Sequence, residues 1–171
     1  MSLIKKKNDF SVKRMCFAAL LIGLSMILAN VKVFQTIAFD SMPAFVGGIL
    51  LSPVIGGIIG LLGHLFTALM SGFPFTVPVH ILIAIEMFVV VYLTSQIYNK
   101  GKTILACIVG TLLNGVVATL ITGAFMYYTA GGLNPIQFLQ VMGLPLTVAS
   151  LANIVLAFII AKGVKNANIQ I

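Results

Sequence analysis

Apolar residues occur along this chain in long runs, separated by short polar or turn-forming segments. A helix of roughly 20 mostly apolar residues is long enough to cross the hydrocarbon core of a bilayer. The pattern therefore predicts an all-α integral membrane protein with six transmembrane helices in a single domain over residues 1–171, of which residues 1–14 form a basic tail. The predicted spans are 15–33, 42–51, 54–70, 79–98, 103–125 and 144–161.

Turn-forming residues set the boundaries between these spans. The residue before a proline disfavours helix, so Ser52-Pro53 ends a short second span, which is expected to be tilted, kinked or partly re-entrant. Asp40 or Ser41 is expected to cap the start of that span, with Pro43 in its first turn. Residues 71–78 form a loop because two prolines and a glycine do not continue a helix, and residues 126–143 are expected to form a longer loop.

Composition agrees with a membrane protein. Only 8% of the residues are charged and 60% are hydrophobic, whereas a soluble domain needs far more charge to cover its surface. The formal net charge of +7 does not indicate a nucleic-acid partner, because the basic residues lie at helix ends rather than in a patch with interleaved aromatic residues. No soluble domain fits beside the predicted spans.

The basic residues also predict the orientation. Cytoplasmic loops of membrane proteins carry an excess of Lys and Arg. With six spans and both termini in the cytoplasm, nine of the ten basic residues fall on the inner side, and Lys32 alone falls outside. The inner nine are Lys5, Lys6, Lys7, Lys13, Arg14, Lys100, Lys102, Lys162 and Lys165.

Polar residues inside the predicted spans are candidates for ligand binding, because an ionisable group at membrane depth is costly. On the predicted topology they fall in the outer half or the middle of the membrane, which suggests a cavity open to the outside. The candidates are Asp40, His64, His80, Glu86, Asn114 and Asn153.

Each candidate also has a structural interpretation. Asn114 and Asn153 would join helices by hydrogen bonds, and His64 would pair with Glu86 across the third and fourth spans. His80, close to Pro78, would cap a helix and meet water. Asp40 would belong to the helix start described above.

Several chemistries are not indicated. The sequence has no phosphate-binding G-x-x-x-x-G-K-[ST] motif and neither an HExxH nor a GxSxG motif, so we expect no catalytic site, cofactor or metal. Cys16 and Cys107 lie in apolar runs and are expected to be small core residues rather than a disulfide or a metal site. Because the sequence has no phosphate-binding motif of its own, active transport would require ion coupling or a partner that supplies energy.

Small residues in the first span suggest a contact with another helix. Ala19 and Gly23 are four residues apart and so lie on one face, where small side chains allow close helix approach. We expect this face to dock a partner protein.

The chain resembles the substrate-binding S-components of energy-coupling factor (ECF) vitamin transporters in length, in its six spans, in its basic N-terminal tail and in the small residues of its first span. That family typically shows Ala-x-x-x-Ala there, and this chain has Ala19 and Gly23 instead. Residues 39–45 and 63–74 resemble the group that transports α-ribazole, a cobalamin precursor. The resemblance implies a multi-pass subunit of a bacterial cell membrane that works with a membrane coupling subunit and two cytoplasmic ATPase subunits.

The resemblance also suggests a ligand chemistry. α-Ribazole is a neutral benzimidazole nucleoside, whose hydroxyl groups and ring nitrogen suit the polar candidates, and whose ring suits stacking on aromatic side chains. The aromatic candidates are Phe73, Phe75, Tyr127 and Tyr128. Pantothenate is an anion and would be a poor partner for two carboxylates with Lys32 as the one fixed cation. The alternatives are an S-component for another vitamin such as pantothenate, a stand-alone facilitator, or a structural membrane subunit.

Overall fold

The computed structural model describes residues 11–30, 32–34 and 37–167. Apart from one short antiparallel ribbon, the described chain is helical, which confirms the expected all-helical class. The elements are α1 (Val12–Leu28), β1 (Lys32–Phe34), β2 (Ile37–Ala38), α2 (Met42–Leu50), α3 (Pro53–Met70), α4 (Val77–Asn99), α5 (Thr103–Leu112), η1 (Leu113–Val117), α6 (Ala118–Ala130) and α7 (Pro135–Asn166).

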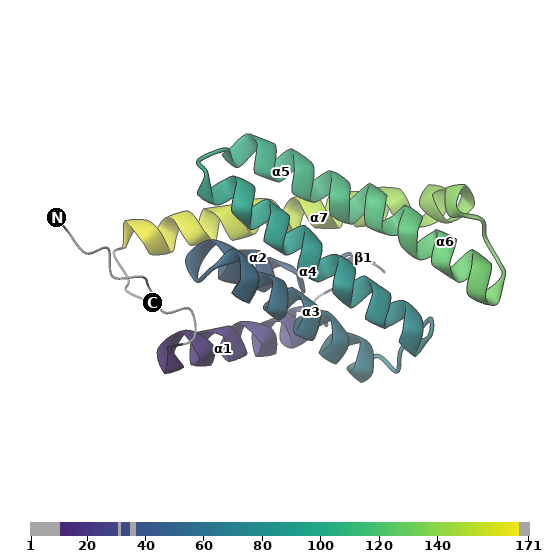
Figure 1. Cartoon of the computed structure of the whole chain (residues 1–171), viewed down its shortest axis with the longest axis horizontal. Helices are drawn as coiled ribbons and strands as arrows, with labels where there is room; N and C mark the ends of the chain where they lie inside the picture. Colours follow the sequence, from purple (N-terminus) through teal and green to yellow (C-terminus); the bar gives the residue numbers. More distant parts are fainter. Residues whose placement is uncertain (1–10, 31, 35–36, 168–171) are drawn as a thin grey trace.

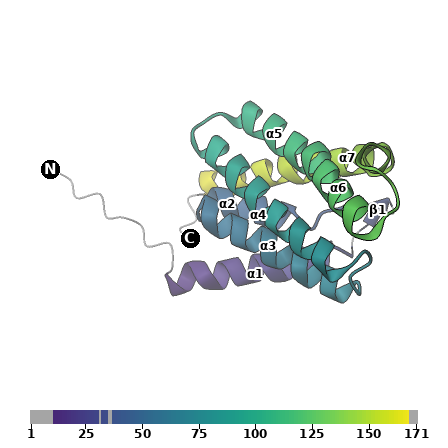
Figure 2. The same cartoon turned by 45° about the vertical axis from the view of Figure 1, so that its right-hand side comes forward.

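Within the described residues, four helical stretches are long and apolar enough to cross a membrane. These stretches are Pro53–Met70, Val77–Asn99, Thr103–Ala130 and Pro135–Asn166. The third comprises α5, the π-helical turn η1 and α6, which form one continuous rod (Figure 2). The two other predicted spans are shorter, because α1 has 17 residues and α2 has 9.

The first predicted span, 15–33, is displaced toward the N-terminus. Helix α1 begins at Val12, so Lys13 and Arg14 belong to the helix and not to the predicted basic tail, whose residues 1–10 lie outside the described part. The helix ends at Leu28, and Lys32–Phe34 forms β1. Val33 and Phe34 favour strand geometry, which explains why an apolar run here does not continue as helix.

The last predicted loop and span are also corrected. The segment 126–143 is mostly helical, because α6 continues to Ala130 and α7 begins at Pro135. Gly131 ends α6 with a φ of 73°, a left-handed conformation that glycine adopts without a steric penalty. Asn134 then starts α7 through a capping box with Gln137, so the helix begins well before the predicted residue 144.

One end of the bundle gathers the start of α1, the α4–α5 turn and the end of α7 (Figure 1). One contact at this end joins α1 to the α2–α3 turn, and a second joins α7 to the last turn of α4. The Arg14 guanidinium on α1 donates a hydrogen bond to the carbonyl of Leu51, directly after α2. The Lys165 ammonium on α7 lies 5.3 Å from the ring centroid of Tyr98 on α4. The described basic residues of the predicted inner segments therefore lie at one end.

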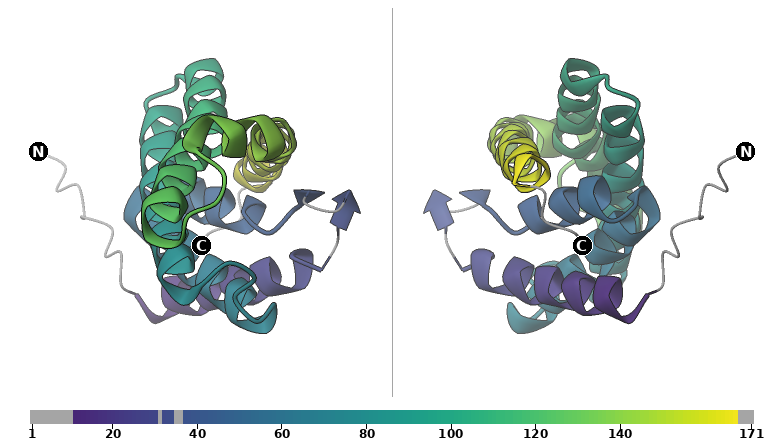
Figure 3. Two further views of the ribbon diagram at one scale, coloured as in Figure 1. Left: turned by 90° about the vertical axis from the view of Figure 1, so that its right-hand side faces the viewer. Right: turned by 90° about the vertical axis from the view of Figure 1, so that its left-hand side faces the viewer.

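Helix α2 lies at the centre of the hydrophobic core, where Phe45 is fully buried. Its glycines allow this position. A Cβ atom on Gly56 of α3 would lie 2.3 Å from the Cα atom of Gly48, so only glycine permits these two backbones to approach so closely. The ribbon β1–β2, which connects α1 to α2, stands at the side of the bundle when it is viewed along its long axis (Figure 3).

Asn153 of α7 holds the ribbon and the start of α2 in place. Its Oδ1 accepts the backbone N–H of Met42 at 2.8 Å, and its Nδ2 donates to the carbonyls of Ala38 and Ala149, each at 2.8 Å. Ser41 is the N-cap residue of α2, as one of the two expected candidates, but its side chain makes no capping bond. Asn153 supplies the missing acceptor from another helix.

Replacing Asn153 with Ala should therefore destabilise the protein without ligand. The variant leaves the Met42 N–H and the Ala38 carbonyl without this partner, at a cost of about 1–3 kcal/mol. In a domain of this size each kcal/mol lowers the melting temperature by roughly 2–4 °C. Thermal unfolding in detergent measures the shift. Asn30→Ala, which removes an exposed side chain that donates to the carbonyl of Met26, is the control, and equal melting temperatures for the two variants would contradict this role.

Candidate functional site

Two neighbouring cavities lie within the bundle, and they share the side chains of His64, Ile83, Asn114 and Leu146. Their volumes are about 180 Å³ and 270 Å³. Small-molecule sites in proteins range over roughly 300–1,000 Å³, so the two together suit one small molecule better than either does alone. We call the smaller cavity the amide chamber and the larger cavity the aromatic chamber.

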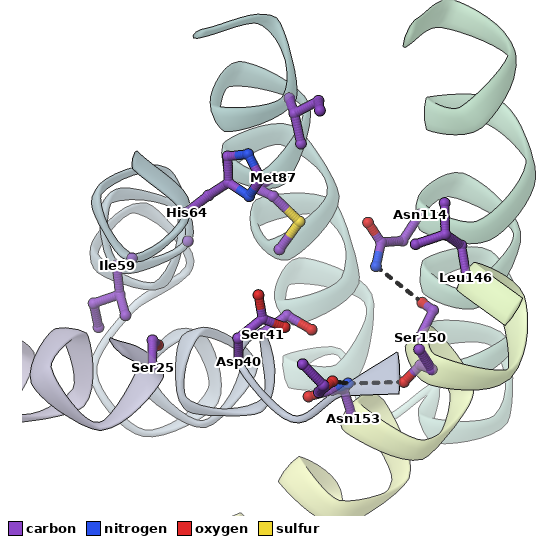
Figure 4. Close-up of a pocket in the computed structure, with 15 residues that line it drawn as sticks. Ser25, Asp40, Ser41, Ile59, His64, Met87, Asn114, Leu146, Ser150 and Asn153 are labelled. Carbon is purple, nitrogen blue, oxygen red and sulfur yellow. Dashed lines mark hydrogen bonds between the residues drawn. The ribbon is translucent and has the colours of Figure 1, made fainter. Parts of the chain in front are cut away.

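The amide chamber has polar groups from five segments of the chain. Its polar lining comprises Ser25, Asp40, Ser41, His64, Asn114, Ser150 and Asn153. Figure 4 shows Asp40 and Ser41, at the start of α2, facing the space between His64 and Asn114. Helix α2 and the ribbon fix these two residues, and Asn153 in turn fixes the ribbon. The remaining lining is aliphatic, including Ile59, Met87 and Leu146, with no aromatic carbocycle.

Asp40 is the carboxylate of the amide chamber. Burial raises the pKa of the Asp40 carboxyl above its ordinary value, and the backbone N–H groups of Asp40 and Ser41 partly oppose this shift. An ionised carboxylate offers about four acceptor positions, so these N–H groups leave capacity for other donors. Asp40 can therefore accept hydrogen bonds from ligand hydroxyl groups.

Asn114 lies on the π-helical turn η1 and reaches both chambers. A single π-helical turn within an α-helix occurs frequently at functional sites. The Asn114 Nδ2 donates a hydrogen bond of 3.2 Å to the Ser150 hydroxyl of α7. This bond joins two helices as the structural interpretation proposed, and it leaves the Asn114 Oδ1 available as an acceptor.

The aromatic chamber is walled by rings. The Phe75 ring lies 6.0 Å from the His80 ring at an interplanar angle of 29°, and 6.3 Å from the edge-on ring of Phe138. All three residues line the chamber. Aromatic side chains that line a cavity favour a flat ring over a flexible aliphatic chain.

His80 carries an unpartnered nitrogen at this chamber. The side chain is 6% exposed, and its Nδ1 lies 3.2 Å from the Nε2 of His64. The His80 Nε2 is buried without a hydrogen-bond partner. Because the two ring nitrogens of a neutral imidazole take opposite roles, a proton on His64 Nε2 makes His80 Nε2 a donor toward the chamber.

Glu86 carries the second unpartnered group. Its Oε2 accepts a hydrogen bond of 3.0 Å from the Thr122 hydroxyl of α6, whereas its Oε1 is buried without a partner. No Lys or Arg side chain lines either chamber among the described residues. An unpaired carboxyl oxygen in an apolar setting is costly, so a ligand group that pairs with Oε1 gains that free energy.

The structure brings six sequence candidates to these chambers. Asp40 and Asn153 line the amide chamber, His80 and Glu86 line the aromatic chamber, and His64 and Asn114 line both. The expected pairing of His64 with Glu86 is wrong, because His64 contacts His80 and Glu86 contacts Thr122. His80 does not cap α4 beside water, since Thr76 provides that cap and His80 is buried.

The aromatic candidates separate into two groups. Phe75 lines the aromatic chamber. Phe73 lines neither chamber, and its ring lies 5.6 Å from that of His80. Tyr127 is 44% exposed, packs edge-on to Tyr128, and lines neither chamber. Cys16 is exposed rather than in the core, and Cys107 is partly buried.

Sequence reasoning missed Thr122, Phe138 and Ser150. Phe138 fell within the segment that was expected to be a loop. Thr122 follows Asn114 by eight residues, about two helical turns, and this spacing is the signal that would have placed both on one face. Ser150 precedes Asn153 by three residues, which gives the same signal on α7.

The Ala19–Gly23 face of α1 points away from the bundle. No atom lies within 4 Å of the position that a Cβ on Gly23 would occupy, and Ala19 is exposed. Ala19 lines an apolar groove of about 250 Å³ between α1 and α3, together with Ile55, Ile58 and Leu62. A second helix can therefore approach α1 at this face.

Comparison with known proteins gives one match. A family model described as "ECF transporter, substrate-specific component" matches residues 13–164. Searches of the curated proteins and of the solved structures found no match.

Proposed function

Because the chain belongs to the substrate-specific component family of ECF transporters, and is accordingly a multi-pass membrane protein, we propose that it captures α-ribazole for uptake. It would do so from outside a bacterial cell membrane. The family is a component of a transporter and works with a membrane-bound transporter module. The proposed ligand is a neutral benzimidazole nucleoside that occupies the two chambers.

The observation that carries this proposal is a pair of unpartnered atoms on two residues that line the aromatic chamber. His80 Nε2 and Glu86 Oε1 are both buried without a hydrogen-bond partner, beside walls formed by Phe75 and Phe138. A buried polar atom without a partner costs about 1–3 kcal/mol, and more when the group is charged. A flat heteroaromatic ring that bears a hydrogen-bonding nitrogen would remove this cost at one of the two atoms while its faces contact the aromatic walls.

The charges around the chambers favour a neutral ligand over pantothenate. Asp40 and Glu86 supply two carboxyl groups, and the described lining includes no Lys or Arg. A carboxylate ligand placed here would lose its hydration without gaining a Lys or Arg partner, which is unfavourable. A nucleoside supplies hydroxyl donors without a charge.

The energy for uptake would come from partner subunits. The sequence has no phosphate-binding loop motif, so we propose that a membrane coupling subunit and two cytoplasmic ATPase subunits drive transport. The Ala19–Gly23 face of α1 is the proposed docking surface, because it is open and its side chains are small.

We propose six membrane passages with both termini in the cytoplasm, with α1 and the α2 segment added to the four longer helices. The basic end of the bundle, which carries Lys100, Lys102 and Lys162, would face the cytoplasm. The α3–α4 and α6–α7 loops would face outward.

Cysteine labelling tests this orientation. In a background without Cys16 and Cys107, a cysteine at Lys100 should react with an impermeant reagent only after the membrane is opened. A cysteine at Leu133, in the α6–α7 loop, should react in intact cells, since 46% of that side chain is exposed. Labelling of both positions from the same side would contradict the proposed orientation.

Calorimetric titration tests the ligand. α-Ribazole should bind the purified protein, and pantothenate should not. Replacing Glu86 with Leu removes a hydrogen bond to a charged or proton-sharing group, worth about 1.5–3 kcal/mol, so affinity for α-ribazole should fall roughly 10- to 150-fold.

Gln96→Leu is the matched control, because Gln96 also lies on α4 but bonds to Tyr92 and lines neither chamber. It should bind α-ribazole like the unchanged protein. Binding of pantothenate without binding of α-ribazole would refute the proposed ligand and leave the family membership intact.

Substitution on α1 tests the docking surface. Gly23→Trp should weaken assembly with the coupling subunit while ligand affinity stays unchanged, because the open space around Gly23 accepts the new side chain within the monomer. Leu24→Trp, at a position 38% exposed and roughly 100° or more around α1 from both Ala19 and Gly23, is the control. Normal co-purification of Gly23→Trp with the partner subunits would exclude this face.

A further inference from the structure

Resting on the proposed function, we infer that the site holds the two halves of its ligand in separate chambers that recognise them independently. The aromatic chamber takes a flat nitrogen heterocycle, whose ring nitrogen is recognised by Glu86. The amide chamber takes a polyhydroxylated half, whose hydroxyl groups are recognised by Asp40. His64 and Asn114 flank the junction between the halves.

The linings of the two chambers differ in the way this division requires. The rings of Phe75, Phe138 and His80 border only the aromatic chamber. The carboxylate of Asp40 and the hydroxyl groups of Ser41 and Ser150 border only the amide chamber. Ring faces stack on aromatic walls, and hydroxyl groups need several acceptors and donors close together.

Asp40 has the chemistry to select hydroxyl groups. A carboxylate is an acceptor-only group, and an acidic residue serves in the same way for the ribose hydroxyl of dinucleotides. The backbone N–H groups of Asp40 and Ser41 favour the ionised form of this carboxyl group, and Asn153 fixes the adjoining turn. The acceptor is therefore positioned before the ligand arrives.

Glu86 has the chemistry to select a ring nitrogen. Glu86 lines the aromatic chamber, and Thr122 occupies its Oε2 while its Oε1 has no partner. One proton shared between Oε1 and an unprotonated ring nitrogen satisfies both groups, whether that proton is closer to oxygen or to nitrogen. We assign the ring nitrogen to Glu86 rather than to His80 because an unpaired buried carboxyl group costs more than an unpaired neutral imidazole.

The junction is where the chambers meet. Of the four residues that line both chambers, His64 and Asn114 are the polar pair. The Ser150 hydroxyl fixes Asn114, and His80 contacts His64. A ligand with a short covalent link between its ring and its hydroxylated half fits this arrangement, whereas two halves separated by a long flexible chain do not.

Titration with whole ligand and ring fragment tests the division. The probes are α-ribazole, 1-methylbenzimidazole, which keeps the ring nitrogen but has no hydroxyl groups, and 1-methylindole, which has CH in place of that nitrogen. The proteins are the unchanged chain, Asp40→Asn, Glu86→Leu and the control Gln96→Leu. Affinities are measured by calorimetry, with displacement of α-ribazole for the weaker fragments.

Asp40→Asn should weaken α-ribazole roughly tenfold or more and leave 1-methylbenzimidazole unchanged within about twofold. Glu86→Leu should weaken both by the same factor and abolish the preference of the unchanged protein for 1-methylbenzimidazole over 1-methylindole. The control variant should change none of these affinities.

Equal weakening of α-ribazole and 1-methylbenzimidazole by Asp40→Asn would overturn the division while leaving the proposed function intact. No binding of 1-methylbenzimidazole at millimolar concentration would do the same, because an independent ring chamber must hold the ring by itself. No binding of α-ribazole to the unchanged protein would overturn the proposed ligand and this inference together.

Discussion

A polar group buried in the membrane needs a hydrogen-bond partner, because no water is available to replace one, and this constraint organises the described structure. Asn153 uses its whole amide to hold β2 and the start of α2, and Asn114 bonds to Ser150. Other buried hydroxyl groups without an assigned partner, such as those of Thr94 and Thr111, can rotate toward the carbonyl four residues earlier. The imidazole of His80 and the carboxyl group of Glu86 have no such local partner, and both border one cavity.

The site also depends on how α2 is held. This short helix is capped at its start by Asn153 of α7 and bonded after its end by Arg14 of α1. Glycines let it pack against α3 at backbone contact distance. Asp40 and Ser41 precede α2 directly, so the position of the amide chamber's carboxylate is set by contacts from both ends of the chain. Helix α1 contributes Arg14 to these contacts and also presents the proposed docking face, so one helix connects the ligand site to the docking surface.

Much of this architecture follows from the sequence because apolar runs and turn residues are local signals. The runs at 54–70 and 79–98 became helices with boundaries close to those expected, and the run at 103–125 became a helical stretch that continues to Ala130. The start of α7 was missed because a capping box at Asn134 outweighed the glycines that precede it. The strand at Lys32–Phe34 was missed because Val33 extends the apolar first span in hydropathy, and hydropathy alone does not separate a short strand from the end of a helix. The polar candidates were found from their cost at membrane depth, but their partners were not. Whether His64 meets Glu86 or His80 depends on helix rotation, which hydropathy does not determine.

The central claim is that a ligand completes the hydrogen bonding that the protein leaves open at Glu86. An experimental structure of the protein with bound α-ribazole tests it most directly. The account predicts the benzimidazole ring against Phe75 and Phe138, its free ring nitrogen within hydrogen-bond distance of Glu86 Oε1, and ribose hydroxyl groups on Asp40. A ligand bound outside the two chambers, with Glu86 Oε1 and His80 Nε2 still unpartnered, would contradict it.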